Sequence, residues 1–281
     1  MTTFVFPGQG SQKAGMGEGL FSAYSNLTAA ADEILGYSIE DICMNNPEGK
    51  LSQTQYTQPA LYTVDVLSYM KKIEESPEPN YVMGHSLGEY AALCAAGVFD
   101  FETGLKLVKK RGELMSQAKG GGMLAVIGLS AEQVKSTLES NNLTTIDVAN
   151  FNSYTQTIVS GLKDDVLAAA PHFEAAGAMM CMPLPVSGAF HSRYMKPSSE
   201  EFANFLDAFE FNAPKMPVIA NVNAQAYSAE TIKSNLISQI DHSVQWVQSV
   251  KSLIDQGETQ FIEVGPGAVL TGLINKIKKD K

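Results

Sequence analysis

The sequence predicts an α/β protein in which a small domain is inserted into a large domain built on a mostly parallel sheet. Three observations support this. A short apolar strand followed by a glycine-rich turn occurs three times, over residues 4–10, 81–88 and 261–267. Amphipathic helical patterns lie between such strands, as is typical of parallel sheets that are covered on both faces. The segment 123–190 instead shows the order β-α-β-β-α-β.

The large domain is expected to span residues 1–122 and 191–281. Its strands are predicted at residues 4–6, 81–83, 217–222 and 261–264, and its clearest helices at residues 59–73, 101–118 and 269–277. Pro59 is expected in the first turn of its helix, where a missing N–H costs little. Ligands of parallel sheets bind beyond the carboxyl ends of the strands, so we expect the three glycine-rich turns to surround a site.

The small domain is expected to span residues 123–190. Its predicted elements are a strand at 123–129, a helix at 131–140, strands at 146–150 and 156–160, a helix at 163–176 and a strand at 178–184. Ser130 and Gln133 match a capping box at the start of the first helix. The polar pair Asn152-Ser153 is expected to turn between the two central strands, and Pro171 predicts a kink in the second helix. This order is that of a ferredoxin-like unit, and the active site is expected in the cleft between the domains.

Composition and charge exclude several classes of function. The chain has 281 residues, 44% of them hydrophobic, and a formal net charge of −10. Such an acidic protein lacks the basic surface that general nucleic-acid binding requires. No apolar run reaches the roughly 18 residues of a membrane span. The first residues carry neither a basic nor an apolar leader region, so we expect no secretory signal.

Three widely spaced cysteines, Cys43, Cys94 and Cys181, lack the CxxC spacing of zinc sites and are odd in number. They favour a reduced, cytoplasmic location over a disulfide framework, and no metal site is expected. Cys94 lies in an apolar helical run, which favours a packed thiol over a nucleophile.

The pentapeptide Gly84-His85-Ser86-Leu87-Gly88 matches GxSxG between a predicted strand and helix. Its glycines permit a sharp turn that exposes the Ser86 hydroxyl and directs the Leu87 N–H toward a developing oxyanion. The alternative is that the glycines serve tight packing alone. A serine elbow above a parallel sheet predicts that the large domain is α/β-hydrolase-like.

A nucleophilic serine needs a base, and the chain has four histidines. His85 adjoins Ser86, but neighbouring residues at a sharp elbow usually point apart. His172 falls in the small domain and His242 in a polar stretch. His191 lies where the chain returns to the large domain beside the cleft, which favours it as the base.

The helix predicted over residues 101–118 places Gly104, Val108, Arg111 and Met115 on one face. An unpaired guanidinium on such a face is costly, so Arg111 calls for an anionic partner. Two interpretations stay open. Arg111 forms an internal ion pair with Asp or Glu, or it is a bidentate clamp for a substrate carboxylate.

Cofactor motifs are not found. Gly8-Gln9-Gly10 begins like a dinucleotide fingerprint, but Lys13 stands where GxGxxG requires its third glycine. No GxxxxGK[ST] phosphate loop occurs either. We therefore expect the protein to act without a cofactor.

Five motifs together resemble the malonyl-CoA:acyl carrier protein transacylase family, in order and in spacing, and they extend over nearly the whole chain. They are Pro7-Gly8-Gln9-Gly10-Ser11-Gln12, Gly84-His85-Ser86-Leu87-Gly88-Glu89-Tyr90, Arg111-Gly112, Gly188-Ala189-Phe190-His191-Ser192 and Glu263-Val264-Gly265-Pro266-Gly267. The resemblance includes discrete acyltransferases that serve polyketide synthases.

This resemblance implies roles for the main candidates. Ser86 is implied to be the nucleophile, His191 its base and Arg111 the clamp for the malonyl carboxylate. Gln9 and Leu87 are implied to supply the backbone N–H groups of the oxyanion hole.

Two further roles follow from the same resemblance. A main-chain carbonyl is implied to orient the base, at the position that matches Gln239. Phe190 resembles the bulky residue of malonyl-selective members, which leaves little room for an α-methyl branch.

The function implied is transfer of a malonyl group from malonyl-CoA to the phosphopantetheine thiol of an acyl carrier protein, through a malonyl-serine intermediate, for polyketide or fatty-acid synthesis. One alternative is an acyl hydrolase that clears stalled acyl groups from carrier proteins. Another is a non-catalytic module that docks carrier proteins. Arg111 discriminates the first two, because an enzyme that cleaves uncharged acyl chains gains nothing from a buried cation.

Overall fold

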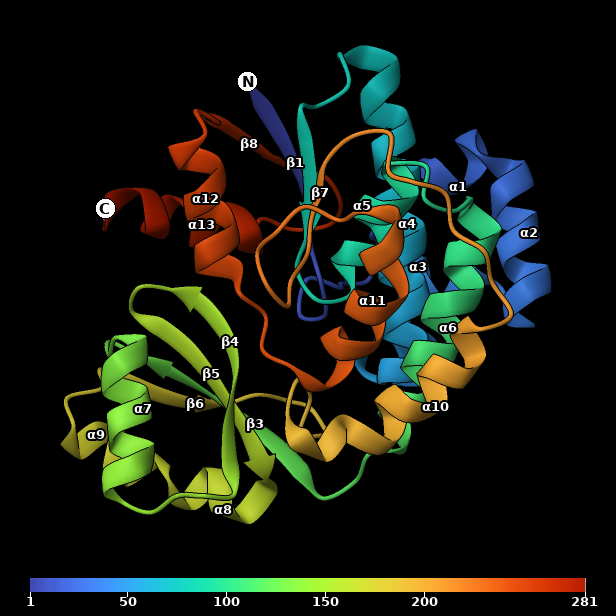
Figure 1. Cartoon of the computed structure of the whole chain (residues 1–281). Helices are drawn as coiled ribbons and strands as arrows, with labels where there is room; N and C mark the ends of the chain where they lie inside the picture. The colour runs from blue at the N-terminus through green and yellow to red at the C-terminus, as the bar shows by residue number, and fades with distance from the viewer. Residues whose placement is uncertain (281) are drawn as a thin grey trace.

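Two separate sheets organise the chain (Figure 1). The computed structural model describes residues 1–280. One sheet is parallel and belongs to the large α/β part, and the other is antiparallel and lies with its helices to one side of it. The predicted fold class is confirmed.

The parallel sheet contains β1 (Thr2–Phe6), β2 (Tyr81–Gly84), β7 (Val218–Ile219) and β8 (Gln260–Glu263), in the order β7-β2-β1-β8. Phe6 at the end of β1 is in register with Gly84 at the end of β2. The loops that follow these two strands therefore leave the sheet side by side. This register brings two motifs that are far apart in sequence to one edge of the sheet.

Helices cover both faces of this sheet (Figure 1). They are α1 (Leu20–Ala23), α2 (Ser25–Leu35), α3 (Ile39–Asn45), α4 (Thr54–Glu75), α5 (Gly88–Ala95), α6 (Phe101–Gln117), α10 (Lys196–Leu206), α11 (Ile232–Asp241), α12 (Trp246–Asp255) and α13 (Val269–Lys279). Side chains of β1 alternate between the faces. Phe4 and Phe6 pack in the core that contains α4 and α5, whereas Val5 packs in the core of α12 and α13.

Helix α4 begins five residues earlier than the apolar stripe predicts. Pro59 is its sixth residue, so its predicted place in the first turn is wrong. The added turn has mostly polar side chains that are buried or half-buried, so a hydrophobic pattern does not reveal it. The hydroxyl of Thr57 donates to the carbonyl oxygens of Leu51 and Gln53 and thereby ties this turn to the preceding chain.

The antiparallel sheet contains β3 (Gly121–Ile127), β4 (Ile146–Ser153), β5 (Gln156–Leu162) and β6 (Met180–Pro183), in the order β4-β5-β3-β6. Helices α7 (Ala131–Ser140), α8 (Lys163–Ala168) and α9 (Ala170–Ala175) accompany it. The sequence order β-α-β-β-α-β with this pairing is ferredoxin-like. The division of the chain at residues 123 and 190 stays a prediction.

Two local predictions in this part have different outcomes. Ser130 and Gln133 form the predicted capping box. The predicted turn at Asn152 and Ser153 is wrong: both residues belong to β4, because Ser153 pairs with Gln156 after two register shifts along the hairpin.

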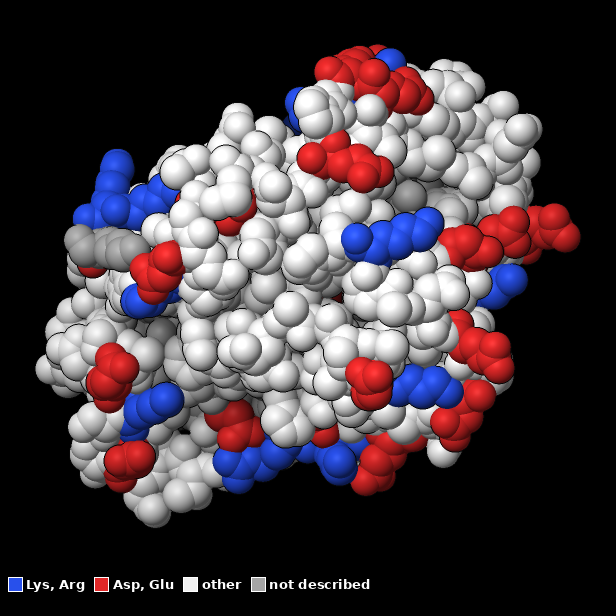
Figure 2. Space-filling view, turned by 45° about the horizontal axis from the view of Figure 1, so that its top comes forward, with Lys and Arg blue, Asp and Glu red and all other residues white. Residues whose placement is uncertain are grey.

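The charged side chains are interspersed on the face drawn in Figure 2, where lysines and arginines lie near acidic side chains with large uncharged areas between them. Within residues 1–280, no helix is long and apolar enough to cross a membrane.

Candidate active site

Ser86 lies on a sharp turn between β2 and α5, with a positive φ of 52°. Gly84 and Gly88, which flank the turn, must be glycines because other backbone segments approach them closely. A Cβ on Gly84 would lie 1.9 Å from the carbonyl carbon of Gly88, and one on Gly88 would lie 2.1 Å from the carbonyl oxygen of Phe6. Larger residues at either position would force α5 away from the sheet.

Asn221 clamps this strained turn, and sequence reasoning missed it. Its Oδ1 accepts a hydrogen bond from the Ser86 N–H at 2.7 Å, and its Nδ2 donates to the Gly84 carbonyl at 2.7 Å. Asn221 follows β7, the strand next to β2. The sequence signal that could have found Asn221 is its polar side chain near the end of a predicted parallel strand.

The hydroxyl of Ser86 lies 2.8 Å from Nε2 of His191, and Nδ1 of His191 lies 2.8 Å from the backbone carbonyl of Gln239. A carbonyl oxygen only accepts, so Nδ1 carries the proton. Nε2 is then free to accept the Ser86 proton. The structure thus brings together three residues that are distant in sequence.

His191 is suited to stay neutral. Burial, and secondarily the positive charge of Arg111, lower the pKa of His191 to about 3. At neutral pH the imidazole is therefore uncharged, and its Nε2 can accept the serine proton directly.

The other histidines lie in different surroundings. His85 points away from the serine hydroxyl, toward Asn152 Oδ1 at 2.8 Å, and its ring packs against Trp246. His242 is exposed and pairs with Asp241. His172 lies on α9 in the small domain.

Arg111 is buried, with an exposed fraction of 1%. Its Nη1 donates to Gln58 Oε1 at 2.7 Å, and its Nη2 donates to Gln239 Oε1 at 2.9 Å and to Ser86 Oγ at 3.2 Å. Within the described residues the guanidinium forms no ion pair, and its Nε–H has no hydrogen-bond partner. Burial lowers the pKa of Arg111 from its very high ordinary value. The internal ion pair considered from the sequence is not formed.

The loop after β1 lies against the serine turn. A Cβ on Gly8 would lie 2.3 Å from the carbonyl oxygen of His85 and 3.7 Å from the Leu87 nitrogen. Within the described residues, the backbone N–H groups of Gln9 and Leu87 have no partner. Gln9, Ser86 and Leu87 line the same cavity, so these two free donors can hold an oxyanion that forms at the serine.

A cavity of about 230 Å³ opens from the serine toward the small domain. Its lining includes Ser86, Arg111, Met123, Met182, Leu184 and Phe190. Phe190 is itself buried and packs against Gly188, where a Cβ would lie 2.4 Å from its ring. The cavity is below the ~300–1,000 Å³ of sites that hold drug-sized ligands, so it suits a short acyl group.

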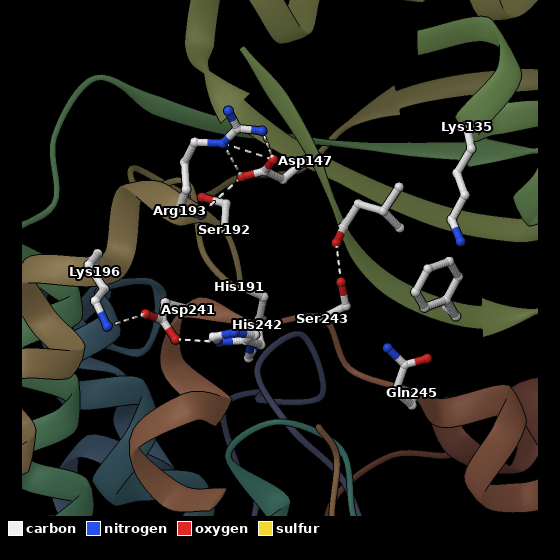
Figure 3. Close-up of a pocket in the computed structure, with 12 residues that line it drawn as sticks. Lys135, Asp147, His191, Ser192, Arg193, Lys196, Asp241, His242, Ser243 and Gln245 are labelled. Carbon is white, nitrogen blue, oxygen red and sulfur yellow. Dashed lines mark hydrogen bonds and ion pairs between the residues drawn. The ribbon is translucent and has the colours of Figure 1, made fainter. Parts of the chain in front are cut away.

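A wider groove leads from the surface to His191 (Figure 3). Arg193 pairs with Asp147 on one side, with its Nε 2.9 Å from Oδ2. Lys196 lies 3.8 Å from Asp241 on the other side. Lys135 from α7 is the third cation of this groove, so three cations stand against the two carboxylates of Asp147 and Asp241.

A serine at a strand–helix turn, with a neutral histidine at its hydroxyl and free N–H donors beside it, is the arrangement of enzymes that form acyl-serine esters. The chain belongs to the acyl transferase domain family, whose model matches residues 3–281. The predicted family resemblance is confirmed.

Known relatives match the whole chain. It is 56% identical to a polyketide biosynthesis malonyl CoA-acyl carrier protein transacylase, PksC, of Bacillus subtilis, over 100% of this chain and 98% of the relative. The crystal structure of a malonyl CoA-acyl carrier protein transacylase from Burkholderia pseudomallei superposes with a TM-score of 0.97 at 44% identity, covering 100% of this chain and 99% of that one. A malonyl-transacylase in complex with a type II PKS acyl-carrier protein superposes with a TM-score of 0.94 at 37% identity, covering 99% and 93%.

Proposed function

We propose that this protein transfers a malonyl group from malonyl-CoA to the phosphopantetheine thiol of an acyl carrier protein, through an ester on Ser86. The observation that carries this proposal is Arg111, a buried guanidinium that touches the serine and has no carboxylate partner in the described chain. The free carboxylate of malonate would supply the missing anion and form charge-assisted hydrogen bonds.

The chemistry proceeds in two half-reactions. His191 Nε2 takes the proton of the Ser86 hydroxyl as Oγ attacks the thioester carbonyl, and the N–H groups of Gln9 and Leu87 hold the tetrahedral oxyanion. The C–S bond breaks, and coenzyme A leaves with the proton from His191. The carrier thiol then attacks malonyl-Ser86, with His191 again as base, and the serine is regenerated.

The groove and the cavity beside Ser86 support malonyl-CoA as the substrate. The groove that ends at His191 carries Lys135, Arg193 and Lys196, whose N–H groups suit the phosphates of coenzyme A and of the phosphopantetheine arm. Phe190 lines the acyl cavity and restricts an α-methyl branch, which favours malonyl over methylmalonyl groups. The reaction needs no cofactor.

The names of the relatives support a place in polyketide or fatty-acid synthesis, and the 56% identity to PksC favours the polyketide route. We place the enzyme in the cytoplasm, because Cys43, Cys94 and Cys181 are all free thiols.

An acyl hydrolase is the second candidate function, since water could also attack an acyl-serine.

The test is the intact mass of the protein after incubation with malonyl-CoA alone. Wild type is expected to gain one malonyl group, which a holo acyl carrier protein then removes as malonyl thioester. Ser86→Ala should gain none, whereas the matched control Cys94→Ala should gain it as wild type does. An adduct that persists in Ser86→Ala, or release of malonate in place of malonyl carrier protein, would contradict the proposal.

A further inference from the structure

Glu89 is a buried acid for which the proposed mechanism has no use. It lies in the first turn of α5, three residues after Ser86, and its exposed fraction is 0%. A carboxylate is costly to bury, so its surroundings must hold it with hydrogen bonds.

Three donors satisfy the two oxygens of Glu89. Oε1 accepts from the Tyr227 hydroxyl at 2.5 Å and from the Asn221 N–H at 3.1 Å. Oε2 accepts from Gln239 Nε2 at 2.6 Å. Gln239 and Asn221 are also the residues that orient His191 and clamp the serine turn.

The side chain of Gln239 has a defined orientation for this reason. A carboxylate oxygen only accepts, so the Gln239 NH₂ group must face Glu89, where it also donates to the Ser86 carbonyl at 2.6 Å. The amide oxygen then faces Arg111 and accepts from Nη2 at 2.9 Å. With the opposite amide orientation, an NH₂ group would face the guanidinium, donor against donor.

We propose that Glu89 is a positioning residue for malonyl selectivity, because it orients the Gln239 amide that holds the Arg111 guanidinium at Ser86. The inference rests on the proposed function. Holding Arg111 through the neutral Gln239 amide has an advantage over a direct ion pair with Glu89. The amide fixes the plane of the guanidinium, and the positive charge of Arg111 stays available to a substrate carboxylate.

The test is Glu89→Gln, compared with wild type in kcat/KM for malonyl-CoA and for acetyl-CoA. In the variant, the side-chain oxygen of residue 89 still serves Tyr227 and Asn221, so its NH₂ group faces Gln239. The Gln239 NH₂ group then either faces another NH₂ group or turns toward Arg111 and gives up its hydrogen bond to the Ser86 carbonyl, and both outcomes weaken its hold on the guanidinium. We expect malonyl transfer to fall about tenfold to a hundredfold and acetyl transfer to fall less than about threefold. Burial raises the pKa of Glu89 to about 7, so the assays are run at pH 8.

Tyr227→Phe is the matched control, because it removes a donor to the oxygen of Glu89 that does not face Gln239. It should keep the malonyl-to-acetyl ratio of wild type. Gln239→Leu keeps the backbone carbonyl that orients His191 but lacks the amide. It should reproduce the selective malonyl loss, and adding Glu89→Gln to it should change the ratio no further.

Equal losses of malonyl and acetyl transfer in Glu89→Gln would overturn the inference, as would a full additional effect in the Gln239→Leu background. The proposed function is judged separately, by the wild-type protein. If wild type prefers malonyl-CoA and Glu89→Gln keeps that preference, the inference alone is wrong. If wild type transfers no malonyl, the proposed function is wrong.

Discussion

At His191, burial and the charge of Arg111 act in the same direction, since both disfavour the imidazolium form. The hydrogen bond to the backbone carbonyl of Gln239 sets the tautomer and raises the pKa, but burial and Arg111 outweigh it. The result is a base that is ready over a wide range of pH.

The first prediction is a flat pH profile for acylation of Ser86 by acetyl-CoA, a substrate without the carboxylate that Arg111 would bind. Because the pKa of His191 is lowered to about 3, the imidazole stays neutral between pH 8 and pH 5 and the rate should hold. A histidine of ordinary pKa near 6.5 would be about 3% neutral at pH 5, a loss of about thirtyfold. Initial rates of acetyl-enzyme formation by mass spectrometry check this, with circular dichroism at pH 5 as the control for folding. A fall in rate centred near pH 6.5 would contradict it.

Residue-level patterns in the sequence predict part of the site. Helical spacing places Arg111 on a buried face, and GxSxG places Ser86 on a turn; the structure has both in those positions. Asn221, Gln58 and Glu89 were missed. Their partners are 53 to 150 residues away in the chain, and no local period encodes such a contact. Glu89 did leave one signal, an acid within the otherwise apolar start of α5.

At the scale of elements, the contact between β1 and α5 decides the geometry of the site. The Phe6 carbonyl lies where a Cβ of Gly88 would stand, so glycine lets α5 begin directly beside β1. This approach also places the loop of Gln9 next to Leu87. Hydrophobic periodicity predicted both elements but not how closely they meet.

The second prediction concerns this approach. Gly88→Ala places a Cβ 2.1 Å from the Phe6 carbonyl oxygen and 2.7 Å from the Pro7 carbonyl oxygen. We expect the free energy of unfolding to fall by about 1–3 kcal/mol, and acylation of Ser86 to slow. Gly272→Ala on α13 is the control. Its Cβ meets nothing within 4 Å, so it should stabilise the protein by about 0.5–1 kcal/mol. Urea denaturation measures both, and equal stabilities of the two variants would be incompatible with the close approach described.

At the scale of the whole molecule, the site is assembled from segments between Gln9 and Gln239. The parallel register of β1 and β2 brings two loops together, α6 carries Arg111, and the return from the small sheet carries His191. The fold class and the β-α-β-β-α-β order followed from sequence patterns alone. The choice between an internal ion pair and a substrate clamp did not, because it depends on which acids lie near Arg111 in space.

The central claim is that the unpaired Arg111 reads the carboxylate of a malonyl group. The most direct measurement is kcat/KM of wild type and Arg111→Ala for malonyl-CoA and acetyl-CoA, with a holo acyl carrier protein as acceptor. Removing the guanidinium leaves a buried carboxylate unpaired, so malonyl transfer should lose about 2–5 kcal/mol, some thirtyfold to several thousandfold. Acetyl transfer should change little, and Arg111→Lys should restore malonyl transfer only in part. Equal losses for both thioesters would contradict the account and make Arg111 a structural residue.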